Sequence, residues 1–175
     1  MKDIKLSIIV FAVIALIAAA CLKIESVSEI PSIEFTSFEI FDTIEHHLQN
    51  KLKAGRLKFK FEDGDGDIGI RPLSDIDTIN LKMTLYRKID GVMQPVATTN
   101  PLLPHSAYRI PYLEKVGQSK VIRGEIIITM IYQFYEQDDD TIKYDFYIID
   151  RAGNNSNIEE TAEIIVSQND IYRKE

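Results

Sequence analysis

The feature that most constrains the fold is an alternation of hydrophobic and polar residues that recurs from residue 32 onward. Residues 56–61 show it most clearly, because Leu57, Phe59 and Phe61 would face one side of a strand and basic residues the other. The chain after residue 32 does not sustain the period of about 3.6 residues that marks an amphipathic helix. We therefore predict an all-β fold.

Turn and strand signals divide the chain further. Residues 121–132 form a nearly all-apolar run rich in Ile, and its β-branched content predicts a buried central strand. Asp90-Gly91 tolerates left-handed backbone, so we expect a tight hairpin there. Residues 95–117 contain four prolines, which predicts a loop with an edge strand at most.

Only residues 42–54 are expected to be helical or irregular. Strands are predicted over residues 33–38, 56–61, 79–85, 121–132, 142–149 and 158–166.

Seven or eight short strands separated by turn signals favour a β-sandwich. Hydrophobic residues make up 45% of the chain and charged residues 27%, which is ordinary for a domain with a packed core. A length of 175 residues suits one domain once a leader is removed. We expect a signal peptide over residues 1–20, a tether over 21–31, the sandwich over 32–168 and a tail over 169–175.

Two motifs resemble those of immunoglobulin-like and fibronectin-like domains. Asp140 stands four residues before Tyr144, as in the sixth-strand signature of the family, and an amphipathic strand with an incidental Tyr explains this pattern equally well. Residues 150–156 resemble the D-x-A-G-N-x-S turn between the last two strands of the bacterial members, where Gly153 and Asn154 suit positive φ angles. The resemblance implies an immunoglobulin-like sandwich.

The N-terminus has the composition of an export signal. Residues 1–5 are net basic, and residues 6–20 are apolar apart from Ser7. This apolar stretch is shorter than the roughly 20 residues that a transmembrane helix needs, so a cleaved signal peptide is favoured over a membrane span.

Residues 17–21, Ile-Ala-Ala-Ala-Cys, resemble the lipobox of bacterial lipoproteins, although Ala18 stands where Leu is most common. The resemblance implies that Cys21 is acylated, becomes the first mature residue and anchors the chain to a membrane of the cell envelope, with the outer membrane expected and the leaflet left open. Ordinary cleavage after Ala20 is the alternative. Because Cys21 is the one cysteine, an intramolecular disulfide is excluded.

The segment most suited to carry chemistry is the acidic loop at residues 61–69, Phe-Glu-Asp-Gly-Asp-Gly-Asp-Ile-Gly. The carboxylates of Asp63, Asp65 and Asp67 could surround one hard cation such as Ca²⁺, and the glycines would let the backbone curl around it. The spacing begins like an EF-hand but fails later, because Ile68 occupies the glycine position and Ser74 that of the bidentate Glu. A solvated Asp/Gly turn is the alternative interpretation.

Asp150 and Asn154 are the expected partners of this loop. In an immunoglobulin-like topology the loops after the second and sixth strands lie at the same end of the sandwich, together with the start of the first strand and the tether. We therefore expect Asp150 and Asn154 to complete a structural calcium site. The F-x-D-G-D-G-D-I-G motif, taken with the turn at residues 150–156, also resembles uncharacterised lipoproteins of Bacteroidota. That resemblance implies an envelope lipoprotein and no known activity.

Several function classes are disfavoured. A net charge of −7 without a basic run argues against nucleic-acid partners. His46, His47 and His105 lack the spacing of a zinc site, and no serine lies in a nucleophile-elbow pattern. We expect a non-enzymatic module that is tethered to the membrane and either binds a protein or glycan partner or serves structurally. The alternative is a small glycan-processing hydrolase that uses acidic residues.

Overall fold

A computed structural model describes residues 27–45, 49–71, 79–96, 106–114, 120–132 and 141–174. These residues contain strands and turns but no helix, so none of them belongs to a helix with the length and apolar character needed to cross a membrane. The expected signal peptide, Cys21, the three histidines and Asp140 lie outside the described residues.

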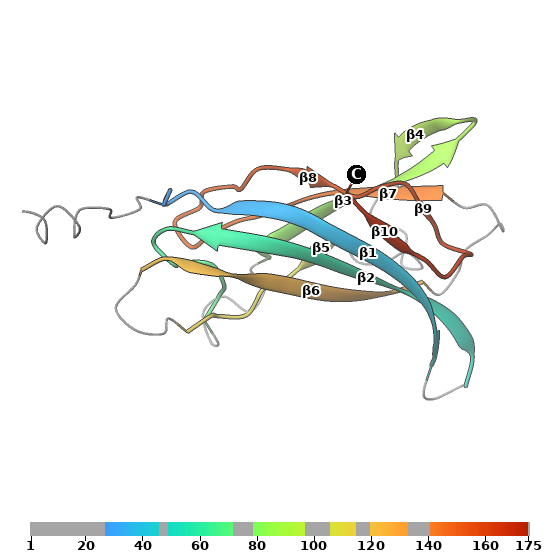
Figure 1. The fold of residues 1–175 in the computed structure, drawn as a ribbon, viewed down its shortest axis with the longest axis horizontal. Coiled ribbons are helices and arrows are strands. Elements are labelled where there is room, and N and C mark those ends of the chain that lie inside the picture. Colours follow the sequence, from blue (N-terminus) through green and yellow to red (C-terminus); the bar gives the residue numbers. More distant parts are fainter. Residues whose placement is uncertain are drawn as a thin grey trace, which may run out of the picture.

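Two antiparallel sheets pack face to face and confirm the predicted β-sandwich (Figure 1). The first sheet has the order β10-β1-β2-β6, and the second has β4-β3-β7-β8 with β5 paired to β3 and β9 to β7. β1-β2-β6 and β4-β3-β7-β8 repeat the A-B-E and C′-C-F-G orders of immunoglobulin-like domains. The strands are β1 Ser32–Ile44, β2 Lys51–Asp63, β3 Leu81–Ile89, β4 Val92–Pro95, β5 Ala107–Tyr108, β6 Ile122–Tyr132, β7 Thr141–Ile148, β8 Glu159–Glu160, β9 Ile164–Ile165 and β10 Ile171–Arg173.

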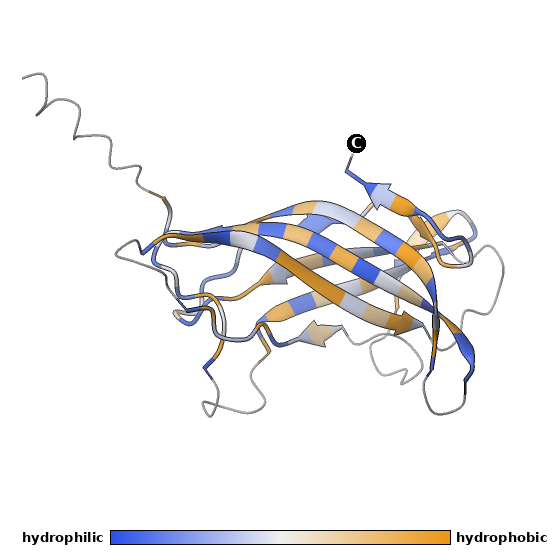
Figure 2. Cartoon of the chain, turned by 60° about the horizontal axis from the view of Figure 1, so that its bottom comes forward, coloured by the Kyte–Doolittle hydropathy of each residue, from blue (hydrophilic) through white to orange (hydrophobic). Residues whose placement is uncertain are grey.

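Aromatic side chains from both sheets fill the core. Phe59 of β2 is fully buried, and its ring centroid lies 5.1 Å from that of Phe146 of β7. Phe38 of β1 stacks on Tyr144 at 5.8 Å. The buried core residues all lie between Ile33 and Val166, so a chain that begins at Leu22 retains all of them. Figure 2 shows the alternation of hydrophobic and hydrophilic residues along β1 and β2 that places these side chains inside.

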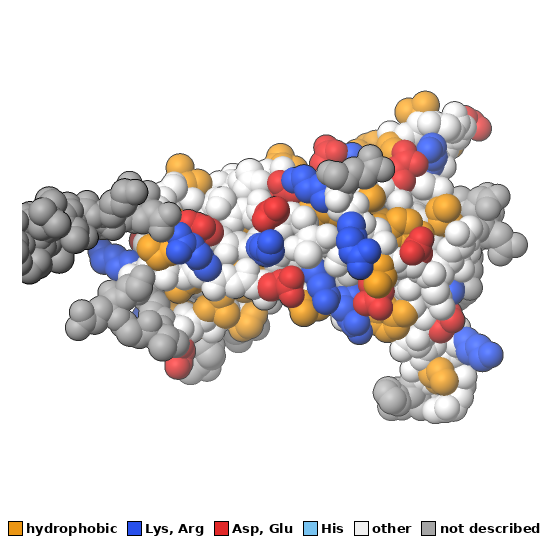
Figure 3. All heavy atoms as spheres, viewed as in Figure 1, with side chains coloured by type: hydrophobic (Ala, Val, Ile, Leu, Met, Phe, Trp, Pro, Cys, Tyr) orange, Lys and Arg blue, Asp and Glu red, His pale blue; other side chains and the backbone are white. Residues whose placement is uncertain are grey.

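Over β1 and β2, the outer face of the first sheet carries oppositely charged side chains. They interleave over β1 and β2 in Figure 3 and form cross-strand ion pairs. Because these pairs are solvent-exposed, each contributes less than about 1 kcal/mol and serves mainly to keep this face polar. The pairs are Glu34–Lys60 at 3.6 Å, Glu39–Arg56 at 3.0 Å and Glu62–Arg123 at 2.9 Å.

The predicted hairpin at Asp90-Gly91 is confirmed. Asp90 has a φ of 50° and Gly91 a φ of 82°, and Ile89 pairs with Val92 across the turn. Two consecutive positive φ angles are what a two-residue type I′ turn requires. In the proline-rich stretch, Pro95 ends β4 and the other described residues contain the two-residue strand β5, which agrees with the prediction of an edge strand at most.

The prediction of a buried central strand at residues 121–132 is wrong. β6 is the edge strand of the first sheet, where Ile127 is 53% exposed and Ile131 42% exposed. A continuous run of β-branched residues predicts extended backbone correctly, but it does not determine whether a neighbouring strand covers the other edge.

The prediction that residues 42–54 are helical or irregular is wrong for residues 42–44 and 51–54, which belong to strands, whereas the described residues 45, 49 and 50 lie outside the strands. β1 continues to Ile44 and β2 begins at Lys51, with the two strands paired up to this point. The alternation was obscured by a β-bulge between Phe35 and Ser37, which moves the inward positions from the odd residues of β1 to the even ones.

The C-terminal part closes the sandwich through short strands. β8 and β9 contain two residues each, and β10 pairs with β1, so strand structure continues past residue 168, where the sequence analysis placed the end of the sandwich. The hydroxyl of Tyr172 accepts a hydrogen bond from the backbone N–H of Ile165 at 3.1 Å and lies 3.3 Å from its carbonyl oxygen. This side chain therefore ties β10 to β9.

Replacing the core residue Phe59 should destabilise the sandwich strongly. We expect Phe59→Ala to lower the free energy of unfolding of residues 22–175 by about 3–5 kcal/mol, because it leaves a cavity between the sheets. Urea denaturation measures this. The control Ile158→Ala, at a side chain that is 65% exposed, should change the free energy by less than about 0.5 kcal/mol. Equal effects of the two substitutions would contradict the core described here.

Candidate metal site

The acidic loop begins at the last residue of β2. Asp63 is fully buried, and its Oδ2 accepts hydrogen bonds from the backbone N–H groups of Asp67 at 2.7 Å and Ile68 at 3.2 Å. Gly66 has a φ of 67°, which allows the chain to turn back sharply. Ile68 is also fully buried and anchors the far side of the turn in the core. The loop therefore wraps around a carboxylate that has been removed from water.

Three carboxylates converge in this loop. One oxygen each of Asp63, Asp65 and Asp67 lies within 4.8 Å of the other two. The Oδ1 atoms of Asp63 and Asp67 are buried and accept no hydrogen bond. Buried charged oxygens without a partner are costly, and so is the repulsion among three carboxylates at this distance. The arrangement thus supplies closely spaced oxygen ligands for a cation.

The same burial and charge repulsion shift the pKa values of Asp63 and Asp67. Burial raises the pKa of the Asp63 carboxyl, and the charges of Asp65 and Asp67 raise it further, against the lowering effect of the two backbone hydrogen bonds. Burial also raises the pKa of Asp67, with Asp150 and Asp65 adding to the effect. Without a cation, these two carboxylates are therefore harder to ionise in the folded chain than in the unfolded chain.

The turn between β7 and β8 packs directly against the acidic loop. The backbone N–H of Arg151 donates to the carbonyl of Asp67 at 3.3 Å, and that of Ala152 donates to Asp67 Oδ2 at 3.0 Å. The Arg151 guanidinium donates to the carbonyls of Ile68 and Gly69 at 3.3 and 2.9 Å. The expectation that these two loops share one end of the sandwich is confirmed.

Asp150 and Asn154 are bonded to each other at this end. Asp150 is buried, and its two carboxylate oxygens accept from the backbone N–H of Asn154 at 2.7 Å and from its Nδ2 at 2.8 Å. The structure thus brings Asp63, Asp65 and Asp67 into one group, which does not include Asp150. Of the two turn residues expected to take positive φ angles, Gly153 has a φ of 92°, whereas Asn154 caps the turn through its side chain.

The chain segment that enters β1 contacts the acidic loop as well. The backbone N–H of Gly64 donates to the carbonyl of Ser28 at 2.9 Å. A Cβ atom at position 64 would lie 2.4 Å from the Ser28 oxygen and 2.5 Å from the Val27 oxygen, so only glycine fits there. Figure 1 shows that β1 starts and β2 ends at the same end of the sandwich. The loop is therefore held by two segments that are distant from it in sequence, residues 27–28 and the turn after β7.

An aromatic residue that the sequence analysis missed borders this end. The ring of Tyr112 lies 5.2 Å from the guanidinium carbon of Arg71 and 5.2 Å from that of Arg151. Arg109 donates to the carbonyl of Arg71 at 2.8 Å. Nothing in the spacing of these residues predicted the cluster, because it forms only when three loops meet.

Comparison with protein-family models, with curated proteins and with solved structures finds no match to this chain. The chemistry of the described residues is therefore the basis for assigning a function. Those residues form one group that can hold a metal ion by the proximity of its ligand atoms, and that group consists of carboxylates.

The stability of the metal-free domain should depend on pH through Asp63 and Asp67. An acid with a raised folded-state pKa stabilises the fold fully below its unfolded pKa of about 3.9 and loses this contribution as pH rises through the folded-state value. In EDTA, Asp67→Asn should therefore stabilise the domain more at pH 7 than at pH 4. Urea denaturation at both pH values measures the difference. An equal effect at both values would contradict a raised pKa for Asp67.

Proposed function

We propose that the chain is a lipid-anchored β-sandwich module of the bacterial cell envelope whose loop end next to the anchor is organised by a structural Ca²⁺ ion. The module is non-enzymatic and binds a protein or glycan partner or serves structurally. The observation that carries the proposal is the convergence of three carboxylates, one of them fully buried with an unpaired oxygen, at the end where residues 27 and 28 pack.

The donor set favours a hard cation. Asp63, Asp65 and Asp67 offer oxygen alone, whereas zinc and copper sites usually include His or Cys. Ca²⁺ takes about six to eight oxygens and tolerates irregular geometry, so carbonyl groups and water would complete the shell. Mg²⁺ requires a near-ideal octahedron and gives up its water reluctantly. An irregular loop rich in glycine therefore suits Ca²⁺ better.

The geometry of the cluster gives no support to the alternative of a glycan hydrolase. Glycoside hydrolysis generally places two carboxyl groups about 5–9.5 Å apart on opposite sides of a sugar ring. Here ligand oxygens of all three acids lie within 4.8 Å of one another, and Asp63 is fully buried and bonded to backbone N–H groups of its own loop. A sugar could not be inserted between these groups without opening the loop.

Few residues separate the expected anchor from the chain segment that contacts the cluster. The N-terminal features predict cleavage before Cys21 and acylation of its thiol, and Val27 contacts the acidic loop six residues later. Two or three acyl chains would hold the module stably on a membrane. A cation in the loop would then hold the segment between the lipid and β1 in one direction, because Gly64 binds Ser28.

Calcium should raise the thermal stability of residues 22–175. In about 1 mM Ca²⁺, a site with a Kd of about 10 μM adds about 2.7 kcal/mol, which raises the midpoint by roughly 5–10 °C relative to EDTA. Asp65→Asn should abolish most of this shift, because it removes a ligand charge. Thermal melts followed by circular dichroism measure both effects.

The matched control is Asp90→Asn, which changes an aspartate in the exposed hairpin turn, where Asn tolerates the positive φ angle. This variant should keep the full calcium shift. The absence of a shift with Ca²⁺ in the native chain would reduce the loop to a turn and refute the metal part of the proposal.

Lipidation should depend on Cys21. When the full chain is expressed in a bacterium, we expect it to sediment with membranes and its mature N-terminal peptide to carry diacylglycerol by mass spectrometry. Cys21→Ala should remove the modification and release the protein from membranes, whereas Ser7→Ala within the leader should leave both unchanged. An unmodified Cys21 in the membrane fraction would refute the anchor and leave the calcium proposal standing.

A further inference from the structure

The edges of the two sheets are protected unequally. A strand at the edge of a sheet exposes unpaired N–H and C=O groups that can pair with another chain, and natural proteins protect such edges with short strands, prolines, charges or covering side chains. In the described part of this sandwich the edge strands are β10 and β6 in one sheet and β4, β5, β8 and β9 in the other. All but β6 show such protection.

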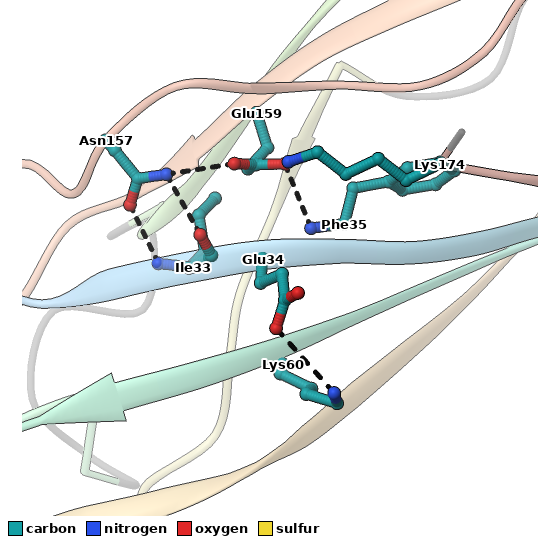
Figure 4. Close-up of polar contacts among 7 residues, drawn as sticks. All are labelled: Ile33, Glu34, Phe35, Lys60, Asn157, Glu159 and Lys174. Carbon is teal, nitrogen blue, oxygen red and sulfur yellow. Dashed lines mark hydrogen bonds and ion pairs between the residues drawn. The ribbon is translucent and has the colours of Figure 1, made fainter.

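The first part of β1 extends past its pairing with β10, and there side chains form hydrogen bonds with the edge backbone groups of β1. Asn157 imitates a strand by accepting from the N–H of Ile33 at 2.8 Å and donating to its carbonyl at 2.9 Å (Figure 4). Glu159 accepts from the N–H of Phe35 at 3.1 Å and is held by Lys174 at 2.9 Å. The backbone groups that an incoming strand would use at this edge are therefore already bonded.

The remaining edges are too short to recruit a partner strand. β4 has four residues and ends at Pro95, which has no N–H to donate. β5, β8 and β9 have two residues each, and β10 has three. The ladders that such segments could form with another chain contain very few hydrogen bonds.

β6 is longer than these strands and carries charged residues only near its start. It runs over 11 residues without proline, and it pairs with β2 along its whole length, from Ile122 opposite Asp63 to Tyr132 opposite Lys53. Within the described residues no strand pairs with its other edge. Ile127 and Ile131 are exposed on the outer face, and Figure 2 shows hydrophobic residues through the middle of the strand. An edge of this kind is an association site.

We infer that β6 pairs antiparallel with β6 of a second copy of this chain, across a two-fold axis at Ile127. Ile127 is the middle residue of β6, so this register overlaps the full strand. It places Ile126 opposite Ile128 and Ile127 opposite its own copy. The half-buried Ile126 and Ile128 would then become covered, and the two first sheets would form one continuous sheet.

The charges of the strand are compatible with self-pairing. The charged residues of β6 are Arg123 and Glu125, and the register places them opposite Ile131 and Thr129. No like charges face each other, although the chain as a whole carries −7. A two-fold contact of this type is closed, because both copies use the same edge. Since the other described edges are protected, association should stop at the dimer.

Sedimentation equilibrium of residues 22–175 tests the inference over about 1 to 100 μM protein, which brackets micromolar dissociation constants. We expect a reversible monomer–dimer equilibrium. Ile127→Lys places two lysines opposite each other at the axis and should weaken the dimer at least tenfold. The control Ile158→Lys, at an isoleucine that is 65% exposed and lies outside the strands, should leave it unchanged. A native chain that stays monomeric, or a dimer that resists Ile127→Lys, overturns the inference.

Cysteine crosslinking tests the register in the same chain, which has no cysteine of its own after residue 21. Ile127→Cys should give a disulfide-linked dimer on oxidation, because facing residues of antiparallel strands lie within disulfide reach. Thr129→Cys should not crosslink to itself, but it should crosslink to Glu125→Cys when the two variants are mixed. Equal self-crosslinking at 127 and 129 would overturn the proposed axis. Both tests run in EDTA and in Ca²⁺, so their outcome is separate from that of the calcium proposal.

Discussion

The pairing of β2 with β1 on one side and with β6 on the other is the interaction on which the rest of the structure depends. β2 pairs with both neighbouring strands along almost its full length. Its inward residues Leu57, Phe59 and Phe61 form one side of the core. Phe146 from the opposite sheet packs on Phe59, so the central strand also sets how the two sheets meet. β2 ends at Asp63, and the acidic loop therefore emerges from the most restrained strand of the sandwich.

That restraint explains how the protein tolerates an unfavourable cluster of charge. A fully buried carboxylate with two close acidic neighbours opposes folding unless a proton or a cation neutralises it. The loop keeps its shape because Ile68 is inserted in the core and because the turn after β7 binds the Asp67 backbone and side chain. Functional sites often contain an energetically unfavourable arrangement that the surrounding structure holds in place. The packing around the acidic loop therefore supports a bound ligand more strongly than the loop sequence does.

Sequence reasoning reached the strands and the meeting of the two loops, because alternation and immunoglobulin-like topology are encoded in short patterns. It failed where tertiary contacts decide the outcome. The bulge between Phe35 and Ser37 reverses the parity of β1 and hid the strand beyond it. The edge position of β6 depends on which other strands cover it, and β-branched composition carries no information about that. The bond between Asp150 and Asn154 forms because the turn places both groups together, and spacing alone could not show it.

A chain that is both lipid-anchored and dimeric through β6 can take few orientations on a membrane. The acidic loop follows the end of β2, opposite the start of β6, so antiparallel pairing of two β6 strands places the two loops at opposite ends of the dimer. The axis that relates antiparallel strands is perpendicular to their sheet. Two anchored chains can share one membrane in this arrangement only when that axis is normal to the membrane, because both tethers then leave at the same height. A lipid-anchored dimer would therefore lie with its continuous sheet parallel to the bilayer, whereas a monomer could stand upright on its loop end.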